Sequence, residues 1–302
     1  MKHVASPYPV MATTTPRERR DTILGSLTRS WEYGAVRPTR TLVLVHGFRG
    51  DHHGLEAVAA HLCASDRELR VVLPDIPGFG LSEPLREAGH DIDGYARWVA
   101  LFRDAVGDQR TDAVLGHSFG SIVVAAALAG GMEAPRAILV NPIAAPALSG
   151  PNAVGTRLAI FYYWLGSRLP ERVGFGVLRW RVVTRGMSVF MAKSRDKHLR
   201  RWIHNQHDLY FGAFANRRVV LDAFRASVSH DVSEYASRIP IPVRLIAADR
   251  DEITPVAEQH RLRTLFPDAS LLVLPEVGHL IHYERPAKTA ADILAFLDGA
   301  RS

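Results

Sequence analysis

A serine flanked by glycines is the residue of this chain whose neighbours best fit it for chemistry. Ser118 lies in the stretch Gly116-His117-Ser118-Phe119-Gly120, between the apolar run AVL and the helix-like stretch SIVVAAALA. A serine at a tight turn between a strand and a helix must adopt a strained backbone, and glycines two residues away on either side relieve the crowding. The start of the following helix also favours negative charge that develops beside it. The pattern predicts that Ser118 is a nucleophile.

A nucleophilic serine needs a base and an acid, and two later segments supply them. A hydroxyl is a poor nucleophile at neutral pH, so a base must lie within hydrogen-bonding reach and an acid must fix the tautomer of that base. His279 follows one strand-like run, and Asp249 and Asp251 follow the run before it. Because the ends of adjacent parallel strands meet at one edge of a sheet, these side chains should converge. The spacing predicts His279 as the base and leaves two candidates for the acid.

The scaffold that must position these residues is indicated by short β-branched and aliphatic runs, separated by segments of helical length. This alternation is typical of a mainly parallel sheet with crossover helices. The predicted class is α/β, with a mainly parallel central sheet flanked by helices. Expected parallel strands are residues 41–45, 70–73, 113–116, 137–140, 243–247 and 270–274, with an antiparallel edge strand at 30–33. Expected helices are residues 55–64, 93–106, 118–129, 255–265 and 286–297.

The regular alternation stops after Asn141 and resumes at Ile239. Between them, helical stretches rich in aromatic residues and arginine replace the strands, and we interpret this insertion as a helical cap. The chain of 302 residues, 47% of them hydrophobic, fits one large α/β domain with such an insertion. We therefore expect a loose N-terminal leader over residues 1–20, a core over 21–143 and 233–302, and a cap over 144–232.

The order serine, aspartate, histidine and the motifs around these residues resemble the α/β-hydrolase superfamily, over most of the chain outside the leader and the cap. In that family the acid stands four residues before a proline that opens the next helix, which implies Asp251 rather than Asp249. Residues 278–286 (GHLIHYERP) are similar to the family's G-H-x-x-x-x-E-x-P ending. The resemblance implies the α/β-hydrolase fold and a catalytic triad of Ser118, Asp251 and His279.

The resemblance also implies an oxyanion hole, the pair of donors that acyl-transfer chemistry needs. Residues 45–50 (VHGFRG) resemble the family's H-G turn, which implies that the backbone N–H groups of Phe48 and Phe119 are the donors. Because only main-chain atoms are used, the side chains of both residues can shape the acyl pocket. Residues 75–82 (DIPGFGLS) are similar to the family's D-x-P-G-x-G-x-S loop, whose role there is mainly structural.

The predicted activity is hydrolysis of a carboxylic ester of a fairly apolar small molecule, through an acyl-enzyme and without a cofactor or metal. Relatives that open epoxides or displace halides carry aspartate where this chain has Ser118, so those reactions are disfavoured. Hydrolysis of carbon–carbon bonds in ring-opened diketones uses the same three residues and remains an alternative. A non-catalytic ligand receptor on the same fold is the alternative from another class. Cleavage of amides or thioesters, and acyl transfer, also stay open.

The cap carries four consecutive aromatic residues at 161–164 (FYYW), most of which we expect to pack the cap onto the core. Trp164, together with Phe48 and Phe119, is predicted to contact the substrate. Between residues 157 and 201 the chain has eleven Lys and Arg against two acidic residues. We interpret this excess as a solvated basic helix face, with peripheral contact to an anionic membrane or attraction of an anionic ester as alternatives. Nucleic acid is not expected as a partner because no recognised nucleic-acid motif is present.

Two groups of histidines could suggest a metal, but neither has a strong zinc signature. They are Asp51-His52-His53 and the set His204, His207 and Asp208. Asp51 is expected to cap the following helix. The single cysteine and the absence of an apolar run of about 18 residues give no sign of an oxidising compartment or a membrane span, so the cytoplasm is the expected location. The oligomeric state is left open.

Overall fold

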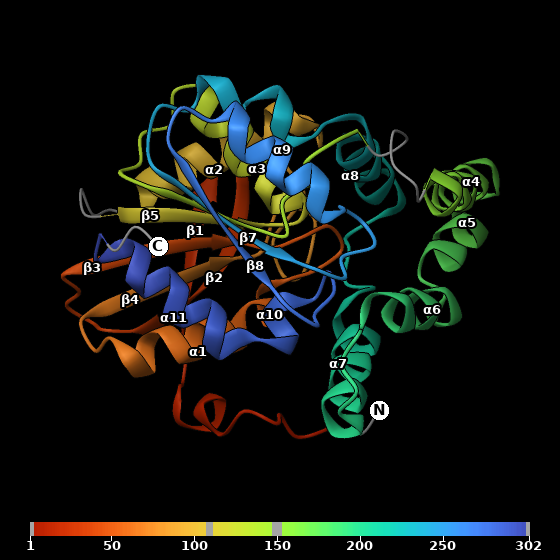
Figure 1. Cartoon of the computed structure of the whole chain (residues 1–302). Helices are drawn as coiled ribbons and strands as arrows, with labels where there is room; N and C mark the ends of the chain where they lie inside the picture. The colour runs from red at the N-terminus through yellow and green to blue at the C-terminus, as the bar shows by residue number, and fades with distance from the viewer. Residues whose placement is uncertain (1–2, 107–110, 147–152, 300–302) are drawn as a thin grey trace.

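The computed structural model of the chain describes residues 3–106, 111–146 and 153–299. Their strands form one eight-stranded sheet with the order β1-β2-β4-β3-β5-β6-β7-β8 (Figure 1). β1 pairs antiparallel with β2, and β2 antiparallel with β4, whereas the remaining pairs from β4 to β8 are parallel. This sheet confirms the predicted α/β class. The strands are β1 (Arg17–Ile23), β2 (Ser26–Gly34), β3 (Arg40–Val45), β4 (Leu69–Pro74), β5 (Thr111–His117), β6 (Ala137–Val140), β7 (Val243–Ala248) and β8 (Ala269–Leu274).

The central strands are apolar on both faces because helices cover both sides of the sheet. Alternate residues of β3 enter different cores: Val43 and Val45 pack in one cluster, and Leu42 and Leu44 in the other. The first cluster includes side chains of α2 (Ile92–Ala105) and α3 (Phe119–Ala129). The second includes side chains of α1 (Glu56–Ser65) and α11 (Pro286–Leu297) on the opposite face, as Figure 1 shows. α9 (Val256–Leu265) contributes Leu262 to the first cluster, and the short α10 (Ile281–Glu284) contributes Ile281 to the second.

The N-terminal segment differs from the expectation of a loose leader. Residues 17–20 belong to β1, which pairs with β2 through a tight turn at Leu24 and Gly25, both with positive φ. β1, and not β2, is therefore the edge strand. Before it, the backbone N–H of Val4 donates to Asn205 Oδ1 at 2.9 Å, and the ring of Tyr8 packs edge-on against Trp202. These contacts, in which Tyr8 is partly buried, hold the segment against the protein surface.

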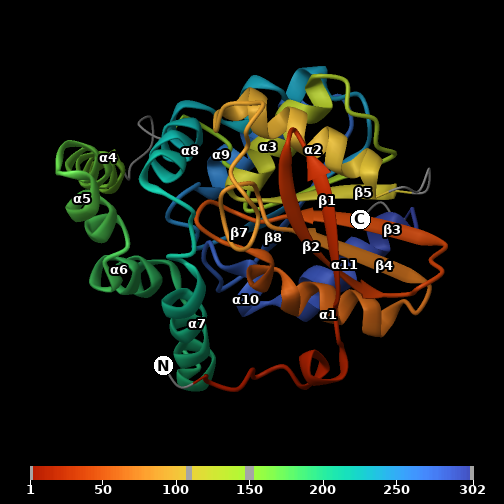
Figure 2. The same ribbon diagram turned by 180° about the vertical axis from the view of Figure 1, so that it is seen from behind.

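Five α-helices lie between β6 and β7 in the described residues. They are α4 (Ala153–Arg168), α5 (Glu171–Leu178), α6 (Arg181–Met191), α7 (Lys197–Tyr210) and α8 (Arg217–Ser229). Figures 1 and 2 show α4 to α7 as a row beyond one end of the sheet, with α8 beside the core helices. The segment is helical as expected, and its role as a cap remains a prediction. Residues 147–152, near its expected start, lie outside the described residues. No described helix has the length and apolar character needed to cross a bilayer.

Candidate active site

Ser118 occupies the turn between β5 and α3, with φ 52° and ψ −119°. This backbone conformation is uncommon for a residue other than glycine. The flanking glycines are required by close backbone approach: a Cβ on Gly116 would lie 2.3 Å from the carbonyl oxygen of Gly120, and a Cβ on Gly120 would lie 2.4 Å from that of Val45. The turn therefore has the strained shape expected of a serine held out from the end of a strand.

The three residues singled out from the sequence lie within hydrogen-bonding distance of one another. His279 Nε2 is 2.8 Å from Ser118 Oγ, and His279 Nδ1 is 2.8 Å from Asp251 Oδ2. Asp251 follows β7 and His279 follows β8, so the topology of the sheet brings both to the end of β5. The side chains of Asp251 and His279 are buried, whereas Ser118 is partly exposed and can be reached from outside. This arrangement can take a proton from the serine hydroxyl.

Asp251 accepts four hydrogen bonds that favour its charged form. Its Oδ1 accepts from the backbone N–H groups of Ile253 at 2.8 Å and Thr254 at 3.2 Å, and its Oδ2 accepts from Asn141 Nδ2 at 2.9 Å and from His279. Burial by itself would raise the pKa of Asp251, but His279 and the backbone donors outweigh burial, so the pKa is lowered. Asp251 is therefore an anion beside the imidazole of His279.

Asn141 is a contact of Asp251 that the sequence analysis missed. It directly follows β6, the strand between β5 and β7, and its backbone has a positive φ of 45°. Its place at the carboxyl end of a central parallel strand was the available signal. Asp249, the other candidate acid, is exposed and accepts a hydrogen bond from the backbone N–H of Val277 at 3.2 Å. That bond braces the loop after β8, and it is Asp251 that contacts His279.

The turn after β3 lies directly beside Ser118. A Cβ on Gly47 would lie 3.1 Å from His117 Nδ1 and 3.2 Å from Ser118 Cβ, so a larger residue at this position would need those side chains to shift. The next residue, Phe48, has its ring centroid 6.3 Å from that of Phe119, and it also contacts Tyr163 and Phe224. The structure thus brings the turn before Phe48 close to Ser118 and groups the rings of Phe48 and Phe119 with other aromatic rings, while the oxyanion role of the two backbone N–H groups stays a prediction.

Arg49, the residue after Phe48, is buried with 1% of its surface exposed, and the sequence analysis did not single it out. Its guanidinium donates to the carbonyl oxygens of Leu178 at 2.8 Å and Phe211 at 3.1 Å, and to the hydroxyl of Tyr163 at 3.2 Å. Leu178 ends α5 and Phe211 follows the last residue of α7. Because helix C-termini carry partial negative charge, both carbonyls stabilise the buried cation. Arg49 therefore fixes two inserted helices to the turn beside Ser118.

Trp164 does not occupy the position predicted for it. It is 49% exposed on α4, and its ring stacks on Phe161, with the guanidinium of Arg168 5.8 Å away. Its neighbour Tyr163 is buried and contacts Phe48. Tyr163, and not Trp164, therefore lies against the turn beside Ser118, because adjacent residues of a helix point about 100° apart.

A second group of histidines joins α6 to α7. Ser188 Oγ lies 2.6 Å from His204 Nδ1 and 2.7 Å from His207 Nδ1. Burial, followed by the charges of His204 and Arg185, lowers the pKa of His207 to about 3. His207 is therefore neutral at ordinary pH, and the hydroxyl can donate to one ring and accept from the other. Close to the active site, His117 is also buried and neutral, with its pKa lowered to about 3 by burial and by His279.

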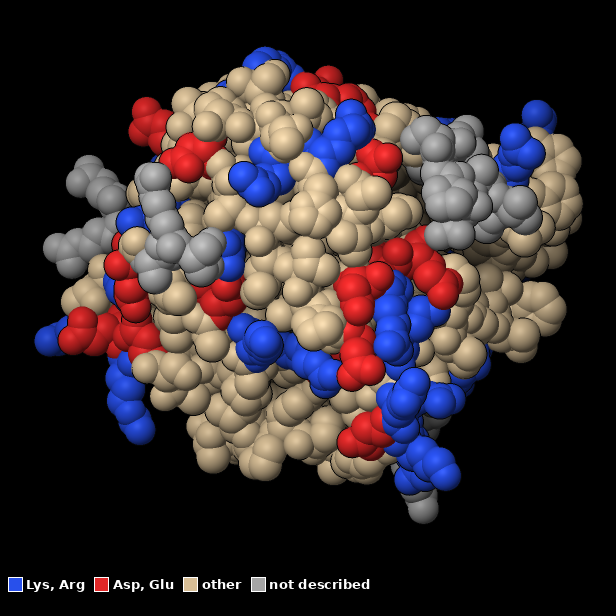
Figure 3. Space-filling view, viewed as in Figure 1, with Lys and Arg blue, Asp and Glu red and all other residues tan. Residues whose placement is uncertain are grey.

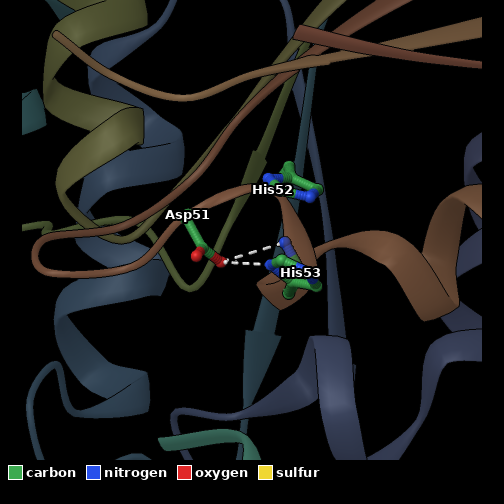
Figure 4. Close-up of side chains that lie close together, drawn as sticks. All are labelled: Asp51, His52 and His53. Atoms are coloured by element: carbon green, nitrogen blue, oxygen red, sulfur yellow. Dashed lines mark hydrogen bonds and ion pairs between the residues drawn. The ribbon is translucent and has the colours of Figure 1, made fainter. Parts of the chain in front are cut away.

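Asp51, His52 and His53 form the one compact set of metal-type ligand atoms found among the described residues, all within 4.8 Å of one another (Figure 4). Asp51 Oδ1 accepts from the backbone N–H of His53 at 3.0 Å, which confirms its expected role as a helix cap, and contacts His53 Nδ1. His52 Nδ1 contacts Asp75 Oδ1 at 2.9 Å, and its ring stacks on Trp31. Hydrogen bonds within the protein thus engage the Nδ1 atoms of both rings, which gives the group a structural role beside the loop that contains Asp75.

The sequence pattern of the alpha/beta hydrolase family matches residues 42–292, and the chain belongs to this family. Its sheet and flanking helices are those of the α/β-hydrolase fold. Among curated relatives, the acetyltransferase component of an acetoin cleaving system from Pseudomonas putida, a dihydrolipoyllysine-residue acetyltransferase, is 28% identical over 93% of this chain and 70% of its own length. Polyketide synthase ThaQ from Burkholderia thailandensis is 27% identical over 78% of this chain, which spans only 11% of that protein.

Solved structures agree on the fold. A membrane phospholipase A, described as a bacterial virulence factor, superposes with a TM-score of 0.75 at 22% identity, covering 98% of this chain and 89% of its own. At this level of identity the likeness concerns the fold alone.

Proposed function

We propose that this chain is a serine hydrolase that cleaves carboxylic esters of apolar small molecules through an acyl-enzyme intermediate. The observation that carries the proposal is the unbroken run of hydrogen bonds from Ser118 through His279 to Asp251, at a strained turn that leaves the serine accessible. Membership of the alpha/beta hydrolase family supports the reaction class.

In the first step, Ser118 Oγ forms a bond to the carbonyl carbon of the ester while His279 Nε2 takes the hydroxyl proton. Asp251 stabilises the imidazolium that results. The carbonyl oxygen becomes an oxyanion, and in this proposal the backbone N–H groups of Phe48 and Phe119 donate to it. The bond between the carbonyl carbon and the leaving oxygen then breaks, and His279 returns the proton to that oxygen, releasing the alcohol.

In the second step, water repeats the sequence on the acyl-serine. His279 takes a proton from the water as its oxygen attacks the carbonyl carbon, and the second oxyanion uses the same donors. The bond to Ser118 Oγ breaks, His279 returns the proton to the serine, and the carboxylic acid leaves. No cofactor or metal enters this scheme.

The preference for an apolar substrate rests on the aromatic rings around the serine. Phe48 packs against Phe79, Phe119, Tyr163 and Phe224, so the turn beside Ser118 carries a group of aromatic rings that could contact an acyl chain. Such surface favours a hydrocarbon chain over a charged acyl group. The geometry does not separate esters from thioesters or amides, because all three use the same groups.

The test is turnover of a p-nitrophenyl ester series from acetate to palmitate by the wild type and by Ser118→Ala. We expect wild-type turnover that depends on chain length, and a loss of about 10⁴-fold or more in the variant. Circular dichroism of both proteins controls for folding. If the folded wild type cleaves no ester, the proposal of an ester hydrolase is wrong and two alternative functions are favoured. Turnover of a ring-opened diketone would indicate carbon–carbon bond hydrolysis, and saturable ligand binding without turnover would indicate a receptor.

A further inference from the structure

Exposed large apolar side chains are concentrated in one segment of the described residues. Of twelve such side chains, eight lie between residues 158 and 190, and these include every Phe and Trp among the twelve. We call the eight the outer face: Leu158, Phe161, Trp164, Val173, Trp180, Val182, Val189 and Phe190. They lie on or between α4, α5 and α6, the helices farthest from the sheet in Figures 1 and 2. In Figure 3 the surface at this edge is mostly tan, with a few blue side chains. A patch of this kind marks an interaction site.

α6 departs from an ordinary surface helix at some of its positions. Its buried residues are Thr184, Ser188 and Met191, two of them polar, and Ser188 is hydrogen-bonded to His204 of α7. Its exposed positions combine two arginines with Val182, 65% exposed, and Val189, 53% exposed. A helix that faces water normally buries its apolar side chains. The exposed valines beside arginines therefore fit a boundary between an apolar medium and water.

α4 combines exposed aromatic rings with a basic side chain. Phe161 and Trp164 stack with their ring centroids 5.8 Å apart, and the guanidinium of Arg168 lies 5.8 Å from the ring of Trp164. Amphipathic aromatic rings beside arginine are typical of helices that lie in the interface of a bilayer, where the ring enters the acyl boundary and the cation stays at the headgroups.

Charge selects among the occupants that an apolar face could accept. The segment 157–190 contains six arginines and one acidic residue, Glu171, a net charge of +5 (six minus one). Glu171 itself is paired with Arg217 of α8. A second copy of this chain would bring the same positive charge against it, whereas anionic lipid headgroups are complementary to it.

We propose that the outer face docks on the surface of an anionic lipid bilayer, with Phe161 and Trp164 at the acyl boundary and Arg168 among the headgroups. The opposite sides of the same helices reach the active-site turn, since Tyr163 of α4 contacts Phe48 and Leu178 of α5 accepts from Arg49. The protein would thus bind the bilayer through the helices that also border the serine. This docking requires no reaction, so it stands or fails independently of the proposed hydrolase activity.

The first test is flotation of the full-length Ser118→Ala protein with phosphatidylcholine vesicles, with and without phosphatidylglycerol. The Ser118→Ala change prevents hydrolysis of the lipid, so binding alone is measured. We expect binding to the vesicles that contain phosphatidylglycerol, and a decrease in binding as salt is raised. Equal binding to both vesicle types, or none to either at low salt, overturns the proposal.

Variants locate the binding surface. The double change Phe161→Ser with Trp164→Ser should weaken binding by about tenfold or more. Its matched control is Val36→Ser with Leu101→Ser, which removes two exposed apolar side chains elsewhere and should leave binding unchanged. Arg168→Glu should also weaken binding by about tenfold, whereas Arg263→Glu, an identical charge change on exposed α9, should have a much smaller effect. Equal loss in variants and controls overturns the proposal.

Tryptophan fluorescence gives a readout that does not depend on a destabilising substitution. The chain has five tryptophans, of which Trp31, Trp98 and Trp202 are buried, while Trp164 and Trp180 are about half exposed on the outer face. Lipids with brominated acyl chains should quench the fluorescence, and Trp164→Phe should reduce that quenching while binding is kept. Absence of quenching in bound protein contradicts insertion. A concentration-dependent dimer that Phe161→Ser with Trp164→Ser abolishes assigns the face to a second copy and also overturns the proposal.

Discussion

Two serine side chains of this protein meet histidine rings at nearly the same distance, one in the core and one among the inserted helices. Ser118 Oγ is 2.8 Å from His279, and Ser188 Oγ is 2.6 Å from His204 and 2.7 Å from His207. Among these three histidines, only His279 has its second ring nitrogen hydrogen-bonded to a carboxylate, that of Asp251. Ser188 instead bridges two rings.

The two serines also differ in backbone and access. Ser118 has a positive φ and is partly exposed at the start of α3, whereas Ser188 lies within α6 and is fully buried. Contact with a histidine therefore does not distinguish a nucleophile from a structural hydroxyl. A carboxylate behind the ring, a strained turn and a route to the oxygen do distinguish them, and each can be tested separately.

The largest expected difference is in covalent labelling. A fluorophosphonate should form a phosphorus–oxygen bond at Ser118 with loss of fluoride, because His279 can remove the hydroxyl proton. Ser188 should stay unlabelled. Intact-mass and peptide mass spectrometry measure this directly, with Ser118→Ala expected to abolish labelling and Ser188→Ala expected to preserve it. A labelled Ser188 would erase the distinction between the two sites.

The second expected difference concerns the carboxylate behind the ring. Asp251→Asn removes the charge that stabilises the imidazolium and should lower ester turnover by about 10⁴-fold. Asp249→Asn is the matched control: that carboxylate is exposed and contacts a backbone N–H of the loop, so turnover should change by less than about threefold. Steady-state kinetics with p-nitrophenyl esters gives both values. Greater sensitivity at Asp249 would reverse the assignment of the acid.

The smallest expected effect is on acid stability. The pKa of His207 is lowered to about 3 in the folded protein, so only the unfolded chain binds this proton between about pH 6.5 and pH 3. The contribution of His207 to the free energy of unfolding is therefore fully present above the pKa of the unfolded chain, and it is lost as pH falls below that pKa. His207→Gln should reduce the loss of unfolding free energy between pH 7 and pH 5 by about 2 kcal/mol. Urea unfolding measures it, with the exposed His260→Gln as control. An unchanged slope would mean that His207 is protonated in the folded state.

Much of the sheet was predictable because its parallel strands are buried on both faces and read as continuous apolar runs. β6 matches its expected bounds, residues 137–140, and β3 extends its expected range by one residue. β1 was missed because its sequence, RERRDTI, is charged and has no apolar alternation; its pairing with β2 is the contact that fixes it. An edge strand with one face in water needs little apolar sequence.

The candidate site was predictable where short motifs encode backbone geometry, as at Ser118. Contacts of residues outside these motifs, made across the fold, could not be predicted in this way. Asn141 and Asp251 are 110 residues apart, and Arg49 reaches Tyr163, 114 residues away. The run of four aromatic residues at 161–164 indicated that some of them contact the core. It did not indicate which one, because successive residues of a helix point about 100° apart.

Arg49 ties the packing of two inserted helices to its own hydration. Its guanidinium is held by the C-terminal carbonyls of two helices and by one hydroxyl. Moving α5 or α7 away from Phe48 would break these bonds and return a charged group to solvent, directly beside the turn that borders Ser118. Separation of these helices from the turn and hydration of Arg49 are therefore thermodynamically linked. A substitution that loosens either helix should also expose the arginine, which is 1% exposed in this structure.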